Sequence, residues 1–144
     1  MIIDTTYLLP LVRIDVKTDL LKALVEGRLK VELDLGDLRV NLISIFELQA
    51  KASKLRIPPR YVSEAINTIF KVFDIIPYYR EDIIEIAYEL LQKYINDYID
   101  CIILATAITQ KEQLVTEDRK LLSIKDMIKE QYNIEILSYS DLVK

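Results

Sequence analysis

Short apolar segments alternate with amphipathic helical segments along the whole chain, and this alternation restricts the possible folds more than any other feature. The expected strands are residues 1–4, 40–43, 74–77, 113–116 and 133–137. The expected helices are residues 18–26, 44–55, 60–73, 81–94, 97–111 and 118–129. Strands that alternate with helices form βαβ units, which build a parallel sheet with helices on both faces. We therefore expect one α/β domain over residues 1–144, with a parallel sheet of about five short strands.

Some boundaries in this scheme depend on local signals. Thr18 and Ser44 are expected to cap the helices that follow them, and Gly27 is expected to stop the first helix. Residues 30–38 are ambiguous, because Val31 and Leu33 belong to an alternating pattern that fits either an edge strand or an extended loop.

The chain contains no histidine and a single cysteine, Cys101, which excludes several kinds of site. Nucleophilic catalysis by Ser-His-Asp or Cys-His groups needs the missing imidazole. Histidine-ligated zinc is excluded for the same reason, and one cysteine cannot form a cysteine cluster or a disulfide. The remaining groups are carboxylates, lysines, tyrosines and hydroxyls. Carboxylate oxygens are hard ligands that suit Mg²⁺ and Mn²⁺.

Charge and hydropathy limit the ligands and the cellular location that can be expected for the chain. The formal net charge of −4 argues against binding of nucleic acid by bulk positive charge alone, although a local basic rim remains possible. No apolar run approaches the roughly 18 residues of a membrane span. The first residues lack the basic region of a secretory signal. We therefore expect no membrane association and a cytoplasmic location.

Three acidic residues follow the ends of expected strands. Asp4 ends the first strand, Glu47 lies one turn into the helix after the second, and Asp118 opens the helix after the strand 113–116. The carboxyl ends of parallel strands meet at one edge of the sheet, so these carboxylates should lie close together. Each also has a local explanation. Asp4 could cap a helix, Glu47 could form a capping box with Ser44 or pair with Lys51, and Asp118 could stabilise a helix N-terminus.

Asp100 is harder to explain by local structure. The helix from Tyr98 to Ile108 is apolar on nearly every face, so it should be buried. No lysine or arginine lies one turn away from Asp100, and Asp97 adds a like charge. An unpaired buried carboxylate costs several kcal/mol, on the order known for buried ions. A cation from solution would remove this cost. A protonated Asp100 or an arginine from a distant segment are the alternatives.

The order and spacing of four segments resemble PIN domains, especially the toxin ribonucleases of VapBC-type toxin–antitoxin pairs. The four segments are residues 2–6 (IIDTT), 43–48 (ISIFEL), 100–107 (DCIILATA) and 114–118 (LVTED). The likeness covers nearly the whole chain, and the last two segments are its most specific part. Many members have a glycine just before the Leu-Val-Thr strand, where this chain has Gln113. The stretch 30–39 matches no feature of the family.

The resemblance implies an endoribonuclease that hydrolyses RNA phosphodiesters with Mg²⁺ or Mn²⁺. The residues that it assigns to the site are Asp4, Glu47, Asp100 and Asp118 as the four acids, Asp97 as an additional acid, and Thr6 and Thr116 as supporting hydroxyls. Asp4 and Asp100 are expected to be the principal metal ligands. The resemblance also implies an antitoxin protein as partner and a homodimer.

Other functions are open or excluded. The chain could instead be a catalytically inactive PIN-fold module for protein interaction, with structural acids. Asp4 is followed by Thr5 and Thr6, which matches neither the early acidic pair of receiver domains nor the Asp-x-Asp of haloacid-type phosphatases. No Gly-x-x-x-x-Gly-Lys loop is present, which excludes a P-loop nucleotide hydrolase. For an active nuclease, the candidates for a basic rim are Arg13, Lys51, Lys54, Arg56 and Arg119.

Overall fold

The computed structural model describes residues 1–144 and contains one sheet with all strands parallel. The strands are β1 (Ile2–Ile3), β2 (Arg39–Asn41), β3 (Asp74–Ile76), β4 (Leu114–Val115) and β5 (Ile136–Leu137). Their order across the sheet is β3-β2-β1-β4-β5. Ile2 pairs with Leu114 and Ile3 pairs with Val115, so β1 and β4 end side by side. The five-stranded parallel sheet predicted from the sequence is confirmed.

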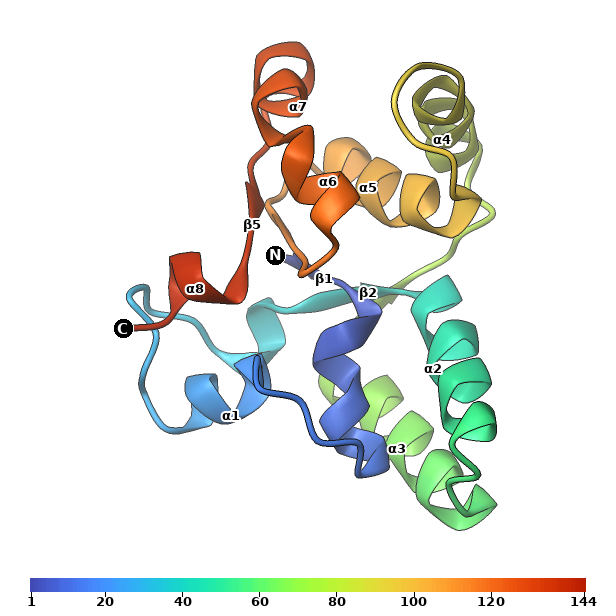
Figure 1. Ribbon diagram of the computed structural model, residues 1–144, viewed down its shortest axis with the longest axis vertical. Helices are drawn as coiled ribbons and strands as arrows, with labels where there is room; N and C mark the ends of the chain where they lie inside the picture. The colour runs from blue at the N-terminus through green and yellow to red at the C-terminus, as the bar shows by residue number, and fades with distance from the viewer.

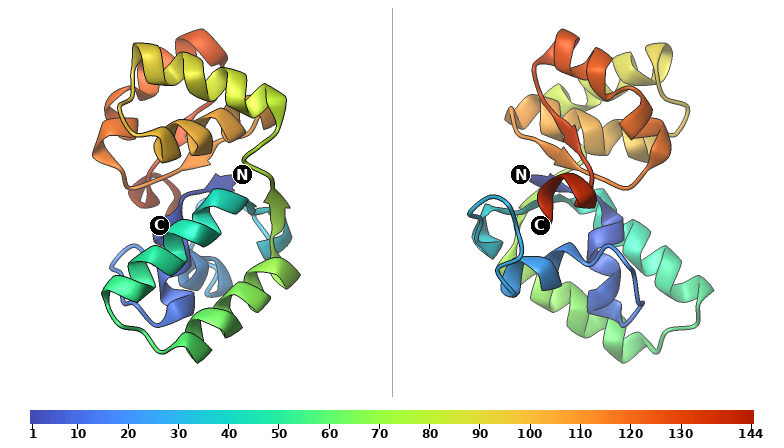
Figure 2. Two further views of the ribbon diagram at one scale, coloured as in Figure 1. Left: turned by 90° about the vertical axis from the view of Figure 1, so that its right-hand side faces the viewer. Right: turned by 60° about the vertical axis from the view of Figure 1, so that its left-hand side comes forward.

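Helices cover both faces of this sheet (Figure 1). The lower half in that view holds the 3₁₀ helices η1 (Thr5–Val12) and η2 (Leu35–Asp37) and the α-helices α1 (Leu20–Val25), α2 (Leu42–Lys54) and α3 (Pro59–Val72). The upper half holds α4 (Glu81–Lys93), α5 (Tyr98–Gln110), α6 (Arg119–Ser123) and α7 (Lys125–Tyr132). The short α8 (Tyr139–Leu142) follows β5 and lies beside α1. Figure 2 shows the same two layers, separated by the sheet, from two other directions.

Side-chain alternation along the strands builds one core on each face. Ile3 and Val115 belong to the core beneath η1, α1, α2 and α3. Ile2 and Leu114, one residue earlier on the same strands, belong to the core against α4, α5 and α6. Successive residues of a strand point to opposite faces, which explains why strands buried on both sides read as continuous apolar runs. None of the helices has both the length and the apolar character that crossing a membrane requires.

The structure differs from the predicted boundaries in several places. Helix α2 is capped by Asn41, whose side chain accepts from the Ile43 N–H at 2.9 Å, so Ser44 lies inside the helix and is fully buried. The predicted helix over 118–129 is two helices that meet at Ile124. The segment after Asp4 is helical and Asp4 caps it, so the local role considered for Asp4 is present, although this segment was not among the expected helices. Residues 30–38 form no strand and contain only the 3₁₀ turn η2.

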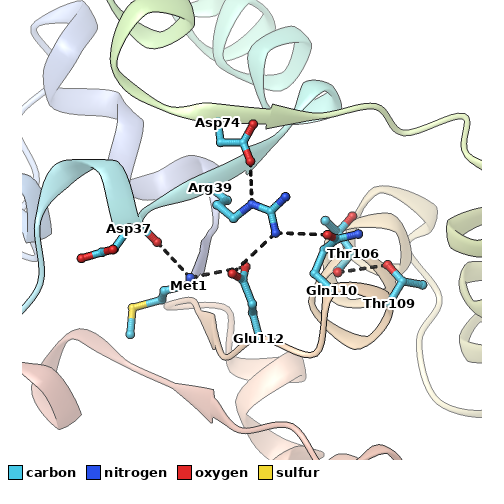
Figure 3. A network of polar contacts seen from close by, with 8 residues as sticks. All are labelled: Met1, Asp37, Arg39, Asp74, Thr106, Thr109, Gln110 and Glu112. Atoms are coloured by element: carbon cyan, nitrogen blue, oxygen red, sulfur yellow. Dashed lines mark hydrogen bonds and ion pairs between the residues drawn. The ribbon is translucent and has the colours of Figure 1, made fainter.

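The amino ends of the strands are joined by a network of ion pairs around Arg39 (Figure 3). Its Nε lies 2.8 Å from Asp74 Oδ2, and its Nη1 lies 3.5 Å from Glu112 Oε1 and 3.1 Å from Gln110 Oε1. The amino group of Met1 lies 3.4 Å from Glu112 Oε2. Asp74 and Glu112 at this edge therefore each face a cation.

The opposite edge, where the strands end, has a different topology. The chain passes from β1 to β2 on one side, and β4 then joins β1 on the other side. Neighbouring strands whose connections leave in opposite directions open a crevice at their carboxyl ends, and ligands of α/β proteins bind at such points. Asp4 follows β1 and Thr116 follows β4, so both residues lie at this switch point.

Candidate active site

Asp4 lies at the centre of the switch point and is nearly buried, with 7% of its surface exposed. It ends β1 and caps η1, where its Oδ1 accepts from the Thr5 N–H at 2.7 Å. Its Oδ2 accepts from the Thr116 hydroxyl at 2.6 Å. Burial raises the pKa of Asp4, and the negative charge of Glu47 acts in the same direction, while the two hydrogen bonds and the positive charge of Lys51 oppose the rise.

Thr116 connects two of the acids. It is fully buried, and besides donating to Asp4 its hydroxyl oxygen accepts from the Asp118 N–H at 3.0 Å. Asp118 caps α6, because its Oδ1 accepts from the N–H groups of Lys120 and Leu121 at 2.9 and 3.0 Å. Asp118 therefore stabilises a helix N-terminus, as considered above, and this role uses one of its two carboxylate oxygens.

Asp100 lies on the first turn of α5 and is half-buried, next to the enclosed residues 101–107. Burial and then the negative charges of Asp97, Asp118, Asp4 and Glu47 raise the pKa of Asp100 to about 7. No hydrogen bond and no cation opposes this rise, so an arginine from a distant segment is not present. We call Asp4, Glu47, Asp97, Asp100 and Asp118 the acidic cluster, because the charges of the other four all raise the pKa of Asp100.

Asp97 and Glu47 complete the acidic cluster in different ways. Asp97 is exposed and caps α5, where its Oδ1 accepts from the Asp100 N–H at 3.1 Å. Glu47 fulfils neither local role considered for it, because Asn41 replaces Ser44 as the cap. The i,i+4 ion pairs that form are Arg60–Glu64 and Glu89–Lys93, and a pair of Glu47 with Lys51 is not among them. The Glu47 carboxylate is left with no partner within the protein.

Among the candidates for a basic rim, Lys51 acts directly on the acidic cluster. It lies one turn after Glu47 on α2, is half-buried, and its positive charge lowers the pKa of Asp4 against the larger effect of burial. Arg13 is placed differently, because its guanidinium stacks 3.7 Å over the ring of Tyr61 and joins η1 to α3. Lys54, Arg56 and Arg119 are exposed and have no ion pair.

The acids are neighbours but do not form a ready cage for a metal. No three of the Asp, Glu and Cys side chains are placed to hold one ion together. This arrangement still suits Mg²⁺ and Mn²⁺, because Mg²⁺ keeps several of its waters and takes one or two carboxylates directly, together with substrate phosphates. The oxygen donors are of the right kind, and the uncompensated negative charge around Asp100 fits a divalent cation.

Several polar residues that support these elements were not identified from the sequence. Asn41, fully buried at the end of β2, donates from Nδ2 to the Thr106 hydroxyl at 2.8 Å and so joins α2 to α5. Glu117 accepts from the buried Tyr7 hydroxyl at 2.5 Å. Thr106 could have been found, because it is a polar residue in a helix otherwise apolar, as Asp100 is. Tyr7 and Glu117 carry no such signal.

Comparisons with known proteins agree with the fold described above. The family model described as "PIN domain" matches residues 1–127. A chain of a toxin–antitoxin complex from Klebsiella pneumoniae has a similar structure, with a TM-score of 0.62 and 25% sequence identity, over 85% of this chain and 91% of that one. A chain of VapBC2 from Rickettsia felis, solved bound to a DNA fragment from their promoter, superposes with a TM-score of 0.57 and 21% identity. That match covers 95% of this chain and 96% of the other.

No curated protein matches the chain in sequence. The family model nevertheless spans most of the chain and includes every residue of the acidic cluster. The resemblance found from the four sequence segments is therefore confirmed at the level of the family and its fold. The chain belongs to the PIN domain family.

Proposed function

We propose that the chain is a Mg²⁺- or Mn²⁺-dependent endoribonuclease, the toxin of a VapBC-type toxin–antitoxin pair, acting through the acidic cluster. PIN domains are generally nucleases, and membership of the family supports hydrolysis of nucleic acid. The observation that carries the proposal is the environment of Asp100. A carboxyl group whose pKa is raised to about 7 by burial and by four neighbouring acids, with no cation opposing them, is typical of a functional site.

Each residue has a specific role in this proposal. Asp4 and Asp100 are the principal metal ligands, and Glu47 completes the site or positions the attacking water. Asp118 acts through water or on a second ion, and Asp97 is an additional acid; each also caps a helix with one of its carboxylate oxygens. A bound Mg²⁺ or Mn²⁺ supplies a water of lowered pKa and stabilises the charge that develops on the phosphate.

Thr116 and Lys51 support the acidic cluster from neighbouring elements. Thr116 fixes the orientation of Asp4 by its 2.6 Å hydrogen bond. Lys51 is the candidate for holding a substrate phosphate, because its charge reaches Asp4 from the neighbouring helix. Lys51 alone cannot offset the repulsion between the acidic cluster and RNA, which is a polyanion. RNA therefore binds only when metal has neutralised the acids. We therefore expect metal and RNA to bind cooperatively.

The decisive experiment compares cleavage of a single-stranded RNA by wild type, Asp4→Asn and Asp100→Asn in Mn²⁺, Mg²⁺ and EDTA. We expect cleavage by wild type only with a divalent ion, and a loss of at least about 100-fold in each variant, since each lacks a charge that the metal needs. Asp74→Asn is a matched control, because it removes a carboxylate at the opposite edge of the sheet. Equal activity in all four proteins would mean a wrong site or a contaminating nuclease.

A catalytically inactive interaction module is the competing function. In that case wild type would cleave no RNA, and its melting temperature would not respond to millimolar Mn²⁺. In an intact nuclease, Mn²⁺ raises the melting temperature of wild type, because a ligand that binds only the folded state stabilises it. Asp100→Asn abolishes this response.

An antitoxin partner is supported by the Klebsiella pneumoniae complex, in which the similar chain belongs to a toxin–antitoxin assembly. Two exposed apolar residues adjoin the acids in sequence: Phe46, which precedes Glu47, is 64% exposed, and Tyr98, between Asp97 and Asp100, is 37% exposed. Exposed apolar side chains of this kind often belong to protein–protein contacts. Co-expression with the product of an adjacent small reading frame should give a stable complex that no longer cleaves RNA.

A homodimer is part of the same proposal, and light scattering during gel filtration of the isolated chain measures it. A mass near that of two chains is expected, because α4 presents the exposed apolar residues Ile84, Tyr88 and Leu91 at helical spacing. A mass of one chain would remove the dimer from the proposal and leave the nuclease unaffected.

A further inference from the structure

Glu117 lies between Thr116 and Asp118 and connects three parts of the chain that are distant in sequence. Its Oε2 accepts from the Tyr7 hydroxyl at 2.5 Å and from the Tyr139 N–H at 2.8 Å. Tyr7 belongs to η1, which begins directly after Asp4, and Tyr139 begins α8. The loop between β4 and α6 is thus attached on one side to the helix that Asp4 caps and on the other to the C-terminal segment.

The hydrogen bond from Tyr7 is well defined. The Tyr7 side chain is fully buried, and burial, followed by its bond to Glu117 and the charges of Glu117 and Asp4, raises the pKa of the phenol far above its ordinary value. The hydroxyl therefore keeps its proton and acts as the donor. Hydrogen bonds from a neutral donor to a carboxylate are shorter and stronger than those between neutral groups.

The two neighbours of Glu117 carry the contacts that organise the acids. Thr116 donates to Asp4 and accepts from the N–H of Asp118, so the positions of both acids depend on the conformation of residues 116–118. The contacts of Glu117 restrain the middle residue of this loop from outside the acidic cluster. A loop held at its centre and at one end has little freedom to rotate Thr116 away from Asp4.

We propose that Glu117 is a positioning residue of the acidic cluster: by joining Tyr7 to the Tyr139 N–H it fixes the 116–118 loop, and so the geometry of Asp4, Thr116 and Asp118. This role rests on the proposed function, because it assumes that the acidic cluster binds a divalent ion. Tyr139 lies beyond residues 1–127, which the family model matches. The C-terminal segment therefore supports the site in this chain through a contact outside the matched region.

The test compares Glu117→Ala, Glu117→Gln and Tyr7→Phe with wild type. In Glu117→Gln the side-chain amide oxygen still accepts from both donors, so this variant should behave almost as wild type. Glu117→Ala loses both bonds, and Tyr7→Phe loses one. Arg39→Met is the matched control, because it breaks the ion-pair network at the opposite edge of the same sheet (Figure 3) and lowers stability without touching the loop.

Two measurements separate positioning from a merely structural role. The first is hydrogen exchange of the Asp118 amide by NMR without metal, which should be at least about tenfold faster in Glu117→Ala and unchanged in Arg39→Met. The second is the affinity for Mn²⁺, measured by titration of free Mn²⁺ with EPR. It should fall about 10-fold or more in Glu117→Ala, the range found when residues behind metal ligands are changed. Tyr7→Phe should move both values in the same direction by less.

The possible outcomes decide the proposal. If wild type binds Mn²⁺ and Glu117→Ala binds it equally tightly, the positioning role alone is overturned. If Glu117→Gln loses as much Mn²⁺ affinity as Glu117→Ala, the charge of Glu117 matters and its hydrogen bonds do not. This outcome also overturns the positioning role. If wild type takes up no Mn²⁺, the proposed function fails and the positioning role fails with it. Should Glu117→Ala not fold, Tyr7→Phe provides the same comparison.

Discussion

Replacing Asp100 by asparagine in the metal-free protein should increase its stability. The Asp100 side chain has no hydrogen bond and no cation near it, and it is surrounded by four other acids. Asparagine has nearly the same shape and carries no charge. The variant therefore removes a charge that burial and repulsion both disfavour, and it leaves no cavity. It should make folding more favourable although it abolishes the proposed activity.

The expected size follows from the pKa of Asp100, which burial and repulsion raise from 3.8 to about 7. Because the folded protein holds this proton more tightly than the unfolded chain, stability falls as the pH rises between about 4 and 7, by at most about 1.4 kcal/mol per pH unit. The full effect above pH 7 would be about 4 kcal/mol. Since Asp100 is only half-buried, solvent screening leaves about 2 kcal/mol.

The assay is urea unfolding in EDTA, followed by circular dichroism at pH 5 and pH 8. Asp100→Asn should be more stable than wild type by about 2 kcal/mol at pH 8 and by less than about 1 kcal/mol at pH 5, where the folded wild type is already protonated. Asp74→Asn is the control, since it breaks the ion pair with Arg39 and should lower stability by up to about 1 kcal/mol.

Addition of Mn²⁺ should reverse the order of the two proteins. At a concentration of about 100 times the dissociation constant, a bound ion stabilises wild type by about 2.7 kcal/mol, whereas Asp100→Asn gains little. The reasoning is refuted if Asp100→Asn is less stable than wild type in EDTA at pH 8. It is also refuted if the difference between the two proteins is the same at both pH values, because the costs of burial and of repulsion both depend on the ionisation of Asp100.

Two further variants test the supports of the acidic cluster. Thr116→Val removes the donor to Asp4 and the acceptor of the Asp118 N–H. It should lower the free energy of unfolding in urea by about 1–3 kcal/mol and weaken Mn²⁺ binding. An unchanged Mn²⁺ affinity would contradict the role given to Thr116. Asn41→Ala removes the cap of α2 and the hydrogen bond to Thr106. It should lower the free energy of unfolding in the same urea assay by about 2 kcal/mol. A decrease below about 0.5 kcal/mol would argue against the energetic importance of both contacts.

The sheet could be predicted because strands buried on both faces leave a simple trace in the sequence. Ile2-Ile3 and Leu114-Val115 are continuous apolar pairs, each followed by a polar residue, and the helices between strands impose parallel pairing. The boundaries were less accurate because caps compete with one another. Ser44 fits a capping box with Glu47, but Asn41 binds the Ile43 N–H first, and the helix begins earlier than a cap at Ser44 would allow.

The positions of the acids relative to one another also follow from topology, since residues that end parallel strands must lie at one edge. Their orienting contacts do not follow from it. The hydrogen bond from Thr116 to Asp4 spans 112 residues, and the one from Tyr7 to Glu117 spans 110. Such pairs depend on how loops pack after the sheet has formed, and no local pattern in the sequence encodes them. The helix η1 was missed because Pro10 interrupts an apolar run without helical periodicity.

Acidic side chains at the amino edge of the sheet face cations, whereas most of those at the carboxyl edge do not. This contrast argues for a function at the carboxyl edge. At the amino edge, Asp74 and Glu112 each face Arg39, and Glu112 also faces the amino group of Met1. At the carboxyl edge, the charges of four acids raise the pKa of a fifth, Asp100, and the cation that opposes them is Lys51, which lowers the pKa of Asp4. Both edges belong to the same short strands, so the fold permits either solution. Repulsion retained at one edge costs stability, and a divalent cation drawn from solution is the simplest group that would offset it.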